Sequence, residues 1–249
     1  MEDNKGNIYD VHENITKEDM INLKKGQQKL TNIMKLVNEI CEKHNIQYWA
    51  SGGTFIGAIR HDGFIPWDGD IDICMLEKDF DLFDSIFLNE LDYKNLHHIK
   101  YSQYYKSANW EPTAAIHDTT AKYVKSIFND KIFDLSFTTI LLDIFRFKHD
   151  VSNNKLIPYE DSRYDINNFR RSKACEGGIG SIPVDYDFIF PLKKKKFETI
   201  EINIANKYKE ISIMSYGDYP PPIFEVKYRY PHQGLIKIVD NDFKCYKLY

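Results

Sequence analysis

The sequence predicts a single α/β domain in which a mixed β-sheet is flanked by helices. The first indication is local, because an apolar strand pattern, the pair Gly52-Gly53, a short helical pattern and a second apolar strand follow one another in this order. The second indication is global. A chain of 249 residues with 43% hydrophobic and 14% aromatic residues can bury a substantial core in one domain and is not disordered overall.

Caps and periodicity define the first half of the chain. Thr16, with Asp19 three residues later, resembles a capping box, and apolar residues then repeat at helical spacing as far as Cys41. In chain order, the expected elements are a flexible tail over residues 1–15, a helix from Thr16 to about His44, a strand over Ile46–Ala50, a short helix over Thr54–Arg60, a strand over Asp70–Met75 and a helix over Lys78–Leu88. The domain itself is expected to span residues 16–249.

The second half of the chain is less regular. Its expected elements are strands over His97–Tyr105, Thr120–Ile127 and Thr138–Phe147, a polar insertion over residues 150–182, a passage from strand to helix over Phe197–Lys209 and a turn over Tyr216–Pro222. The insertion carries Arg163, Arg170, Arg171 and Lys173, which are candidates for binding a donor or an acceptor. Lys193–Lys196 is interpreted as a solvated face, His61 as an exposed histidine beside a turn, and Asp218 as a turn cap.

The most informative stretch is Trp67-Asp68-Gly69-Asp70-Ile71-Asp72. Because side chains alternate along a strand, Asp70 and Asp72 are expected on the same face, where their charges repel each other unless a cation lies between them. Mg²⁺ takes one or two protein carboxylates and completes its coordination with water and substrate phosphates. The upstream glycine pair opens a helix whose backbone N–H groups can bind phosphate. This order predicts a phosphate-transfer site.

A solvated Asp-x-Asp without a metal is the common alternative. Here the apolar neighbours Ile71, Cys74 and Met75 favour the metal site, because aspartate is rarely buried without a partner. Asp143 presents the same choice. It interrupts an apolar strand either as a hydrogen-bonded strand residue or as a third carboxylate of the site.

The stretch from Tyr48 to Asp72, YWASGGTFIGAIRHDGFIPWDGDID, closely resembles the signature of the LicD family. That family includes bacterial phosphocholine transferases and is related to the fukutin proteins. Leu141-Leu142-Asp143-Ile144-Phe145 is similar to its later strand with a third carboxylate, and Tyr216–Pro222 to its Tyr-Gly-Asp motif with trailing prolines. The resemblance spans roughly residues 20–222. One departure is Gly69, where the family usually has an aspartate.

The resemblance implies a nucleotidyltransferase-like fold and a metal-dependent phosphotransferase. A phospho-alcohol such as phosphocholine would move from a CDP-activated alcohol to a hydroxyl of a glycan or glycolipid, and CMP would be released. The residues expected to be catalytic and to bind Mg²⁺ or Mn²⁺ are Asp70, Asp72 and Asp143. The residues expected at the substrate are Gly52, Gly53, Thr54, Arg60 and Trp67.

The substrate residues differ in what they offer. The glycine pair lets the backbone approach a diphosphate closely, and Arg60 offers that diphosphate a bidentate guanidinium. Trp67 and Tyr48 are candidates for stacking on a base or enclosing a choline ammonium, with a structural role in the loop as the alternative.

Two other function classes stay open. One is a nucleotidyltransferase that attacks the α-phosphate of a nucleoside triphosphate and releases pyrophosphate, which product analysis would separate from CMP release. The other is a catalytically silent binding module that keeps the fold. The joint presence of Asp70, Asp72, Asp143 and Arg60 argues against this second class.

Charge and targeting signals exclude several partners. A net charge of −4 gives no general attraction to nucleic acid or to an anionic membrane. The polar start lacks the apolar region of a signal peptide, and no run of some 18 apolar residues is present. The four cysteines are widely spaced and form no C-x-x-C pair. We therefore expect a cytoplasmic protein with no transmembrane segment and no nucleic-acid partner.

Overall fold

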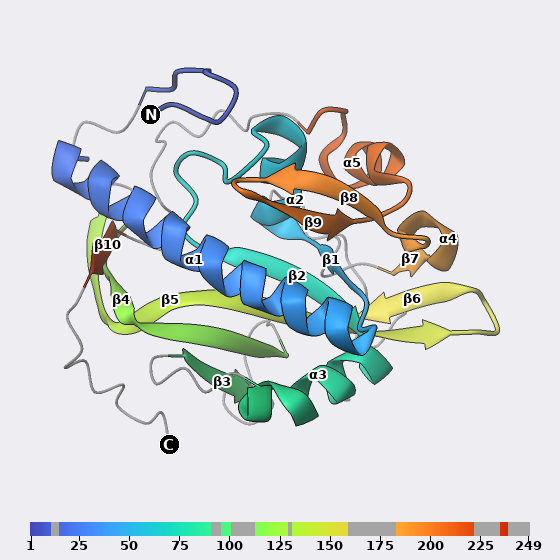
Figure 1. Ribbon diagram of the computed structural model, residues 1–249. Helices are drawn as coiled ribbons and strands as arrows, with labels where there is room; N and C mark the ends of the chain where they lie inside the picture. Colours follow the sequence, from blue (N-terminus) through green and yellow to red (C-terminus); the bar gives the residue numbers. More distant parts are fainter. Residues whose placement is uncertain are drawn as a thin grey trace.

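The computed structural model describes residues 1–10, 15–90, 96–100, 113–128, 131–158, 183–221 and 235–238. These residues form one curled mixed sheet with helices around it and a separate two-stranded hairpin (Figure 1). The predicted α/β class, with a mixed sheet flanked by helices, is confirmed. Among the helices of these residues, none combines the length and the apolarity needed to cross a membrane.

The elements follow the chain in a simple order. They are α1 (Lys17–His44), β1 (Tyr48–Ala50), α2 (Gly52–Arg60), β2 (Ile71–Leu76), α3 (Glu77–Glu90), β3 (Leu96–Lys100), β4 (Ala114–Phe128), β5 (Lys131–Asp150), β6 (Lys155–Pro158), β7 (Val184–Asp185), α4 (Tyr186–Ile189), β8 (Lys193–Phe197), β9 (Ile200–Ile204), α5 (Tyr208–Tyr216) and β10 (Leu235–Ile238).

The main sheet is organised around β2 and β5. Its central path runs β1-β2-β5-β4-β10, while β3 pairs with β4, β6 with β5, and β7 with β6. The β2–β5 pair is parallel, and every other pair between the described strands is antiparallel. The parallel register runs from Ile71 opposite Leu142 to Leu76 opposite Phe147. It therefore sets Asp72 directly beside Asp143.

Helix α1 forms as its sequence predicts. Thr16 Oγ1 accepts a hydrogen bond from the Asp19 N–H, and the Asp19 carboxylate accepts one from the Thr16 N–H, so the capping box is complete. Asn45 ends the helix in the left-handed conformation. The helix buries one apolar face, which includes Leu30 and Met34, and lies along the sheet (Figure 1).

Several predicted boundaries differ from the structure. Helix α2 begins at Gly52 rather than at Thr54, so the glycine pair forms its first turn. Strand β4 begins at Ala114, well before the predicted Thr120, because its pairing with β5 extends the strand beyond the region of clear periodicity. By contrast, residues Phe197–Lys209 contain β9 and the start of α5, which is the passage from strand to helix that the sequence predicted.

Other interpretations concern charged segments. The lysine run Lys193–Lys196 forms most of β8, and three of its four lysines are exposed. The polar insertion contains β6 near its start, and its basic residues Arg163, Arg170, Arg171 and Lys173 lie outside the described residues. So do residues 101–105 of the predicted strand His97–Tyr105 and the last residue of the predicted turn Tyr216–Pro222.

Candidate metal centre

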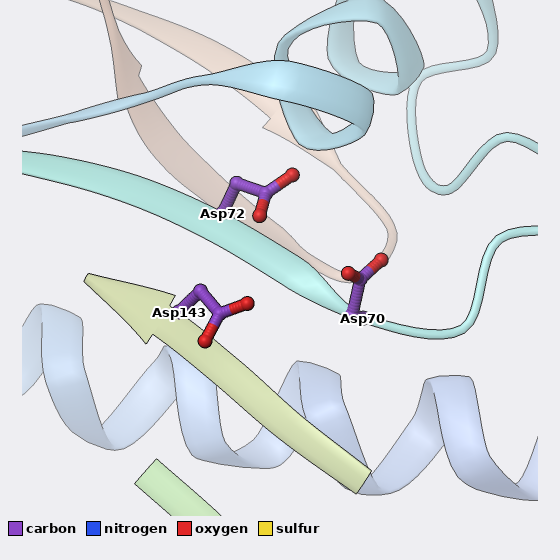
Figure 2. A group of neighbouring side chains, drawn as sticks. All are labelled: Asp70, Asp72 and Asp143. Carbon is purple, nitrogen blue, oxygen red and sulfur yellow. The ribbon is translucent and has the colours of Figure 1, made fainter. Parts of the chain in front are cut away.

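Strands β2 and β5 bring three carboxylates together (Figure 2). Asp72 on β2 lies beside Asp143 on β5, and Asp70 immediately precedes β2. One oxygen from each carboxylate lies within 4.8 Å of the other two. This separation is far below the span of about 12 Å that would prevent the carboxylates from sharing metal ions. The three carboxylates that the sequence assigns to one site thus lie together, and their binding of a metal stays a prediction.

The cluster is largely removed from water. Asp70 is buried, and Asp72 and Asp143 are part-buried. Burial raises the pKa of Asp72 well above its usual value, and the charge of Asp70 raises it further. Burial also raises the pKa of Asp143, and the charges of Asp72 and Asp70 add to that effect. Three ionised carboxylates at this distance therefore require a positive charge among them.

The donor set fits a hard divalent cation. Mg²⁺ and Mn²⁺ prefer carboxylate oxygens, and all three members of the cluster supply them. Asp143 Oδ1 is buried and has no hydrogen-bond partner among the described residues. An unsatisfied buried carboxylate oxygen is costly, and a bound cation would satisfy it. The three carboxylates of Asp70, Asp72 and Asp143 could thus jointly bind the ion.

The glycine pair makes room for two aspartate side chains. A Cβ atom on Gly52 would lie 2.3 Å from Asp72 Oδ2, and one on Gly53 would lie 2.3 Å from Asp68 Oδ2. Gly52 also has a φ angle of +50°, in the left-handed region that side chains rarely adopt. The predicted contact of both glycines with a diphosphate stays a prediction. What the structure adds is a steric reason for glycine at these positions.

Asp68 is a fourth carboxylate beside the cluster. It is buried, and burial raises its pKa to about 7, with the charge of Asp72 adding to the rise. A hydrogen bond with Asp70 and one from the Gly69 N–H oppose this rise. Asp68 thus lies close to Gly53 on one side and shares a hydrogen bond with Asp70 on the other.

Thr54 orients a member of the cluster. Its Oγ1 accepts a hydrogen bond of 2.8 Å from the Asp72 N–H, and its side chain is buried. The bond ties the first turn of α2 to the start of β2. Thr54 was predicted to bind substrate, and that contact stays a prediction.

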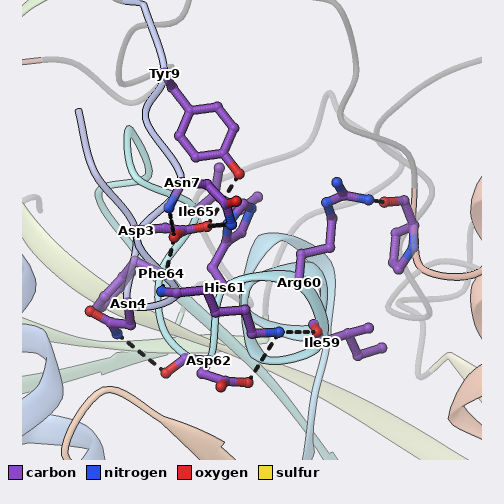
Figure 3. A network of polar contacts seen from close by, with 12 residues as sticks. Asp3, Asn4, Asn7, Tyr9, Ile59, Arg60, His61, Asp62, Phe64 and Ile65 are labelled. Atoms are coloured by element: carbon purple, nitrogen blue, oxygen red, sulfur yellow. Dashed lines mark hydrogen bonds and ion pairs between the residues drawn. The ribbon is translucent and has the colours of Figure 1, made fainter.

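Arg60 lies at the other end of α2. Its Nη1 donates a hydrogen bond of 2.6 Å to the Pro221 carbonyl, which joins α2 to the segment after α5 (Figure 3). Its Nε is buried and has no partner among the described residues. Arg60 therefore has donors left for an anion, and its contact with a diphosphate stays a prediction.

The two aromatic candidates have different surroundings. Tyr48 is buried, its hydroxyl donates to Asn38 Oδ1, and it accepts a hydrogen bond of 3.2 Å from the Asn203 N–H, which supports the structural interpretation. Trp67 is 9% exposed and packs edge-on against Tyr9, with ring centroids 5.5 Å apart. Its predicted contact with substrate stays a prediction.

Residues 1–10, predicted as part of a flexible tail, pack against the loop that follows α2 (Figure 3). The centre of this contact is the buried Asp3 carboxylate, which accepts hydrogen bonds from Lys5 N, Asn7 N, Asn7 Nδ2, Tyr9 Oη and His61 Nδ1. His61 is 1% exposed, so its interpretation as an exposed histidine is wrong. Asp3 lies 58 residues away in the sequence and supplies the acceptor that allows the ring to be buried.

Gly69 faces away from the carboxylate cluster. A Cβ atom there would lie 3.6 Å from Tyr123, 3.7 Å from Ile236 and 3.9 Å from Leu23, all ordinary contacts. A residue at this position therefore meets an apolar wall. The replacement of the usual aspartate by glycine removes no ligand from the three-carboxylate set.

Comparisons with known proteins identify a matching family and several relatives. The model of a family described as LicD/FKTN/FKRP, nucleotidyltransferase domain, matches residues 45–207, which contain all three carboxylates. The lipopolysaccharide cholinephosphotransferase LicD of Haemophilus influenzae is 41% identical over 70 residues, which are 28% of this chain and 26% of that protein. An uncharacterized protein of Rickettsia typhi is 40% identical over 70 residues, 27% of this chain and 23% of its own length.

The match to a human relative covers a smaller share of both proteins. The ribitol 5-phosphate transferase FKRP is 40% identical over 40 residues, which are 16% of this chain and 8% of that protein. The matched stretches therefore cover about a quarter or less of the length of these relatives.

The Asp3–His61 pair should make folding stability depend on pH. Burial lowers the pKa of His61, although the hydrogen bond and the charge of Asp3 oppose this effect. The unfolded chain therefore binds a proton on His61 more readily than the folded protein does. The stability that the buried, neutral His61 provides is complete above a pH of about 6.5 and is lost as the pH falls. Burial alone would raise the pKa of Asp3, but hydrogen bonds from His61, Asn7 and Lys5 outweigh this effect, so the pKa of Asp3 lies well below its usual value. The stability that the ionised Asp3 provides is therefore lost only in stronger acid.

Urea unfolding of the wild type and of His61→Asn at pH 7.5 and pH 5.5 checks this expectation. Asparagine does not titrate, and the other groups of the protein are common to both chains. The wild type should be more stable at pH 7.5, and its advantage should shrink at pH 5.5. An advantage that is the same at both pH values would contradict the assignment.

The steric role of Gly52 predicts a difference between two glycine variants. Gly52→Ala should reduce the free energy of unfolding by about 1–3 kcal/mol, because the methyl group meets the Asp72 carboxylate and the backbone is left-handed. Gly69→Ala adds the same methyl group in ordinary contact and should change stability much less. Denaturant titration of both variants measures the difference, and equal losses would refute the steric argument.

Proposed function

This chain belongs to the LicD family (LicD/FKTN/FKRP, nucleotidyltransferase domain), and from that premise we propose that it is a metal-dependent phosphotransferase. It transfers a phospho-alcohol, phosphocholine or a similar group, from a CDP-activated donor to a hydroxyl of a glycan or glycolipid, and releases CMP. The observation that carries the proposal is the set of three carboxylates within 4.8 Å, beside a glycine turn in which a Cβ atom on Gly52 or Gly53 would collide with an aspartate.

The relatives support the reaction class. One is named a lipopolysaccharide cholinephosphotransferase and another a ribitol 5-phosphate transferase. Both names describe the transfer of an alcohol that carries a phosphate. The carboxylates of this chain are a suitable centre for that chemistry, because phosphoryl transfer depends mainly on positioning and on neutralising charge at the phosphates.

The bonds change at the phosphorus atom that carries the alcohol. The oxygen of the acceptor hydroxyl forms a bond to this phosphorus, and the bond from the phosphorus to the oxygen that bridges the two phosphates breaks. The bridging oxygen leaves with CMP and keeps the electron pair. The hydroxyl proton passes to a base.

The residues divide these tasks among them. Asp70 and Asp72 would hold Mg²⁺ or Mn²⁺, and when bound the cation would neutralise charge on the diphosphate. Asp143, whose raised pKa and unsatisfied oxygen favour uptake of a positive charge, would share the cation or accept the hydroxyl proton. The first turn of α2 and Arg60 would bind the phosphates.

The two other function classes predict different products. A nucleotidyltransferase would use the same carboxylates but would release pyrophosphate from a nucleoside triphosphate. A silent binding module would release neither product. The complete carboxylate set, with its unsatisfied Asp143 oxygen, supports an active centre over a silent one.

Product analysis tests the proposal. The protein is incubated with Mg²⁺, an acceptor glycan and a panel that includes CDP-choline, CDP-ribitol and the four nucleoside triphosphates, and CMP and pyrophosphate are measured. We expect the wild type to release CMP from one CDP-alcohol. It should release no CMP in excess EDTA, and the Asp72→Asn variant should release none with Mg²⁺ present. Asp185→Asn, at an exposed carboxylate on β7, is the control that should keep activity. Pyrophosphate release, or full turnover in EDTA, would overturn the proposal.

Asp143→Asn should lower turnover by roughly 10²–10⁴ while the fold survives, because the amide keeps the shape of the carboxylate and removes its charge. The metal-free variant should be at least as stable as the metal-free wild type, since one repulsive charge is gone. If Asp143 is a base, Mg²⁺ affinity should be unchanged, and if it is a ligand, that affinity should fall as well. Turnover and Mg²⁺ titrations decide, and wild-type values for both would return Asp143 to a structural role.

A further inference from the structure

The loop from residue 61 to residue 70 joins α2 to β2 and has no helix or strand of its own. It nevertheless ends at Asp70, which is one of the three clustered carboxylates. The other two lie on paired strands, so their backbones are fixed by the sheet. Asp70 needs another source of order, because repulsion from Asp72 and Asp143 favours any backbone movement that takes it away from them.

One source is Gln27 on α1. Its side chain is 2% exposed, and its Nε2 donates hydrogen bonds of 2.9 Å to the Asp68 carbonyl and 3.5 Å to the Ile65 carbonyl. Both partners are carbonyls, so the nitrogen of the amide must be the atom that faces them. Gln27 lies on the buried face of α1, between Leu23 and Leu30, where an apolar residue would be the ordinary choice.

The second source is Tyr123 on β4. Its side chain is 3% exposed, and its hydroxyl donates a hydrogen bond of 2.8 Å to the Gly69 carbonyl. Burial raises the pKa of Tyr123 well above its usual value, and the charges of Asp70, Asp143 and Asp68 raise it further, so the hydroxyl keeps the proton that it donates. A Cβ atom on Gly69 would lie 3.6 Å from this ring, so the ring packs beside the loop at this residue.

We propose that Gln27 and Tyr123 are positioning residues that set the metal affinity of the site. Together they bind the carbonyls of Asp68 and Gly69, two consecutive residues that directly precede Asp70, and the two donors come from a helix and a strand. They hold the Asp70 carboxylate toward its partners before a cation arrives, and this preorganisation lowers the cost of binding. The inference rests on the proposed function, in which the cluster binds a divalent cation.

Mn²⁺ binding to the purified full chain tests this inference without an activity assay. Tyr123→Phe removes one hydroxyl, and Gln27→Met removes the amide at nearly constant length. Each variant should bind Mn²⁺ about 10–100-fold more weakly than the wild type, which is the usual effect of losing a partner behind a metal ligand. Calorimetry or electron paramagnetic resonance gives the affinity, and urea unfolding gives the stability of each metal-free protein.

Tyr48→Phe is the matched control. It also removes a buried tyrosine hydroxyl, but one that binds Asn38 and Asn203 and not the loop. Tyr48→Phe should lose stability and keep its Mn²⁺ affinity. Should Gln27→Met fail to fold, Tyr123→Phe decides by itself, because its ring keeps its packing.

The outcomes separate the inference from the function on which it rests. Equal Mn²⁺ affinity in the wild type and in Tyr123→Phe, or an equal loss of affinity in Tyr48→Phe, would overturn the inference and leave the proposed function in place. A wild type that binds no Mn²⁺ would overturn both. Weaker Mn²⁺ binding in Tyr123→Phe but not in Tyr48→Phe, when the two variants have similar stability, supports the positioning role.

Discussion

The parallel pairing of β2 with β5 is the interaction on which the site depends. It sets Asp72 beside Asp143 in one register, and a shift by one residue would turn one of the two carboxylates to the opposite face of the sheet. A parallel pair needs a long crossover connection, and the segment between these strands contains α3, β3 and β4. Two strands of the sheet, β3 and β4, therefore lie within the connection that makes this pairing possible.

The cluster works against the stability of the metal-free fold. Burial and mutual repulsion raise the pKa values of Asp72 and Asp143, so a charged cluster costs free energy unless a cation is bound. The protein holds the charges in place through backbone hydrogen bonds, which do not depend on the cation. The bond from the Asp72 N–H to Thr54 is one of them. Such conflict between local stability and arrangement is typical of functional sites.

The loop before Asp70 shows how an irregular segment becomes ordered. Besides Gln27 and Tyr123, the turn between β8 and β9 contributes, since Glu198 accepts a hydrogen bond from the Phe64 N–H and its own N–H donates to the Asp62 carbonyl. The N-terminal residues add the contact between Asp3 and His61. Functional residues on loops need a rigid scaffold, and here four separate parts of the chain supply it.

The sequence by itself determined the features that depend on near neighbours. The capping box of α1, the period of its apolar face and the shared side of Asp70 and Asp72 follow from spacings of two to four residues, and each could be predicted. Asp143 could be assigned to the site only because its strand resembled that of a known family. Tertiary structure alone decided the contacts of Gln27, Tyr123 and His61, whose partners lie 41, 54 and 58 residues away. A polar residue on the apolar face of α1 was the one local sign of Gln27. No spacing rule reaches that far, because such bonds form only when packing brings two distant segments together and leaves a buried polar group that must be satisfied.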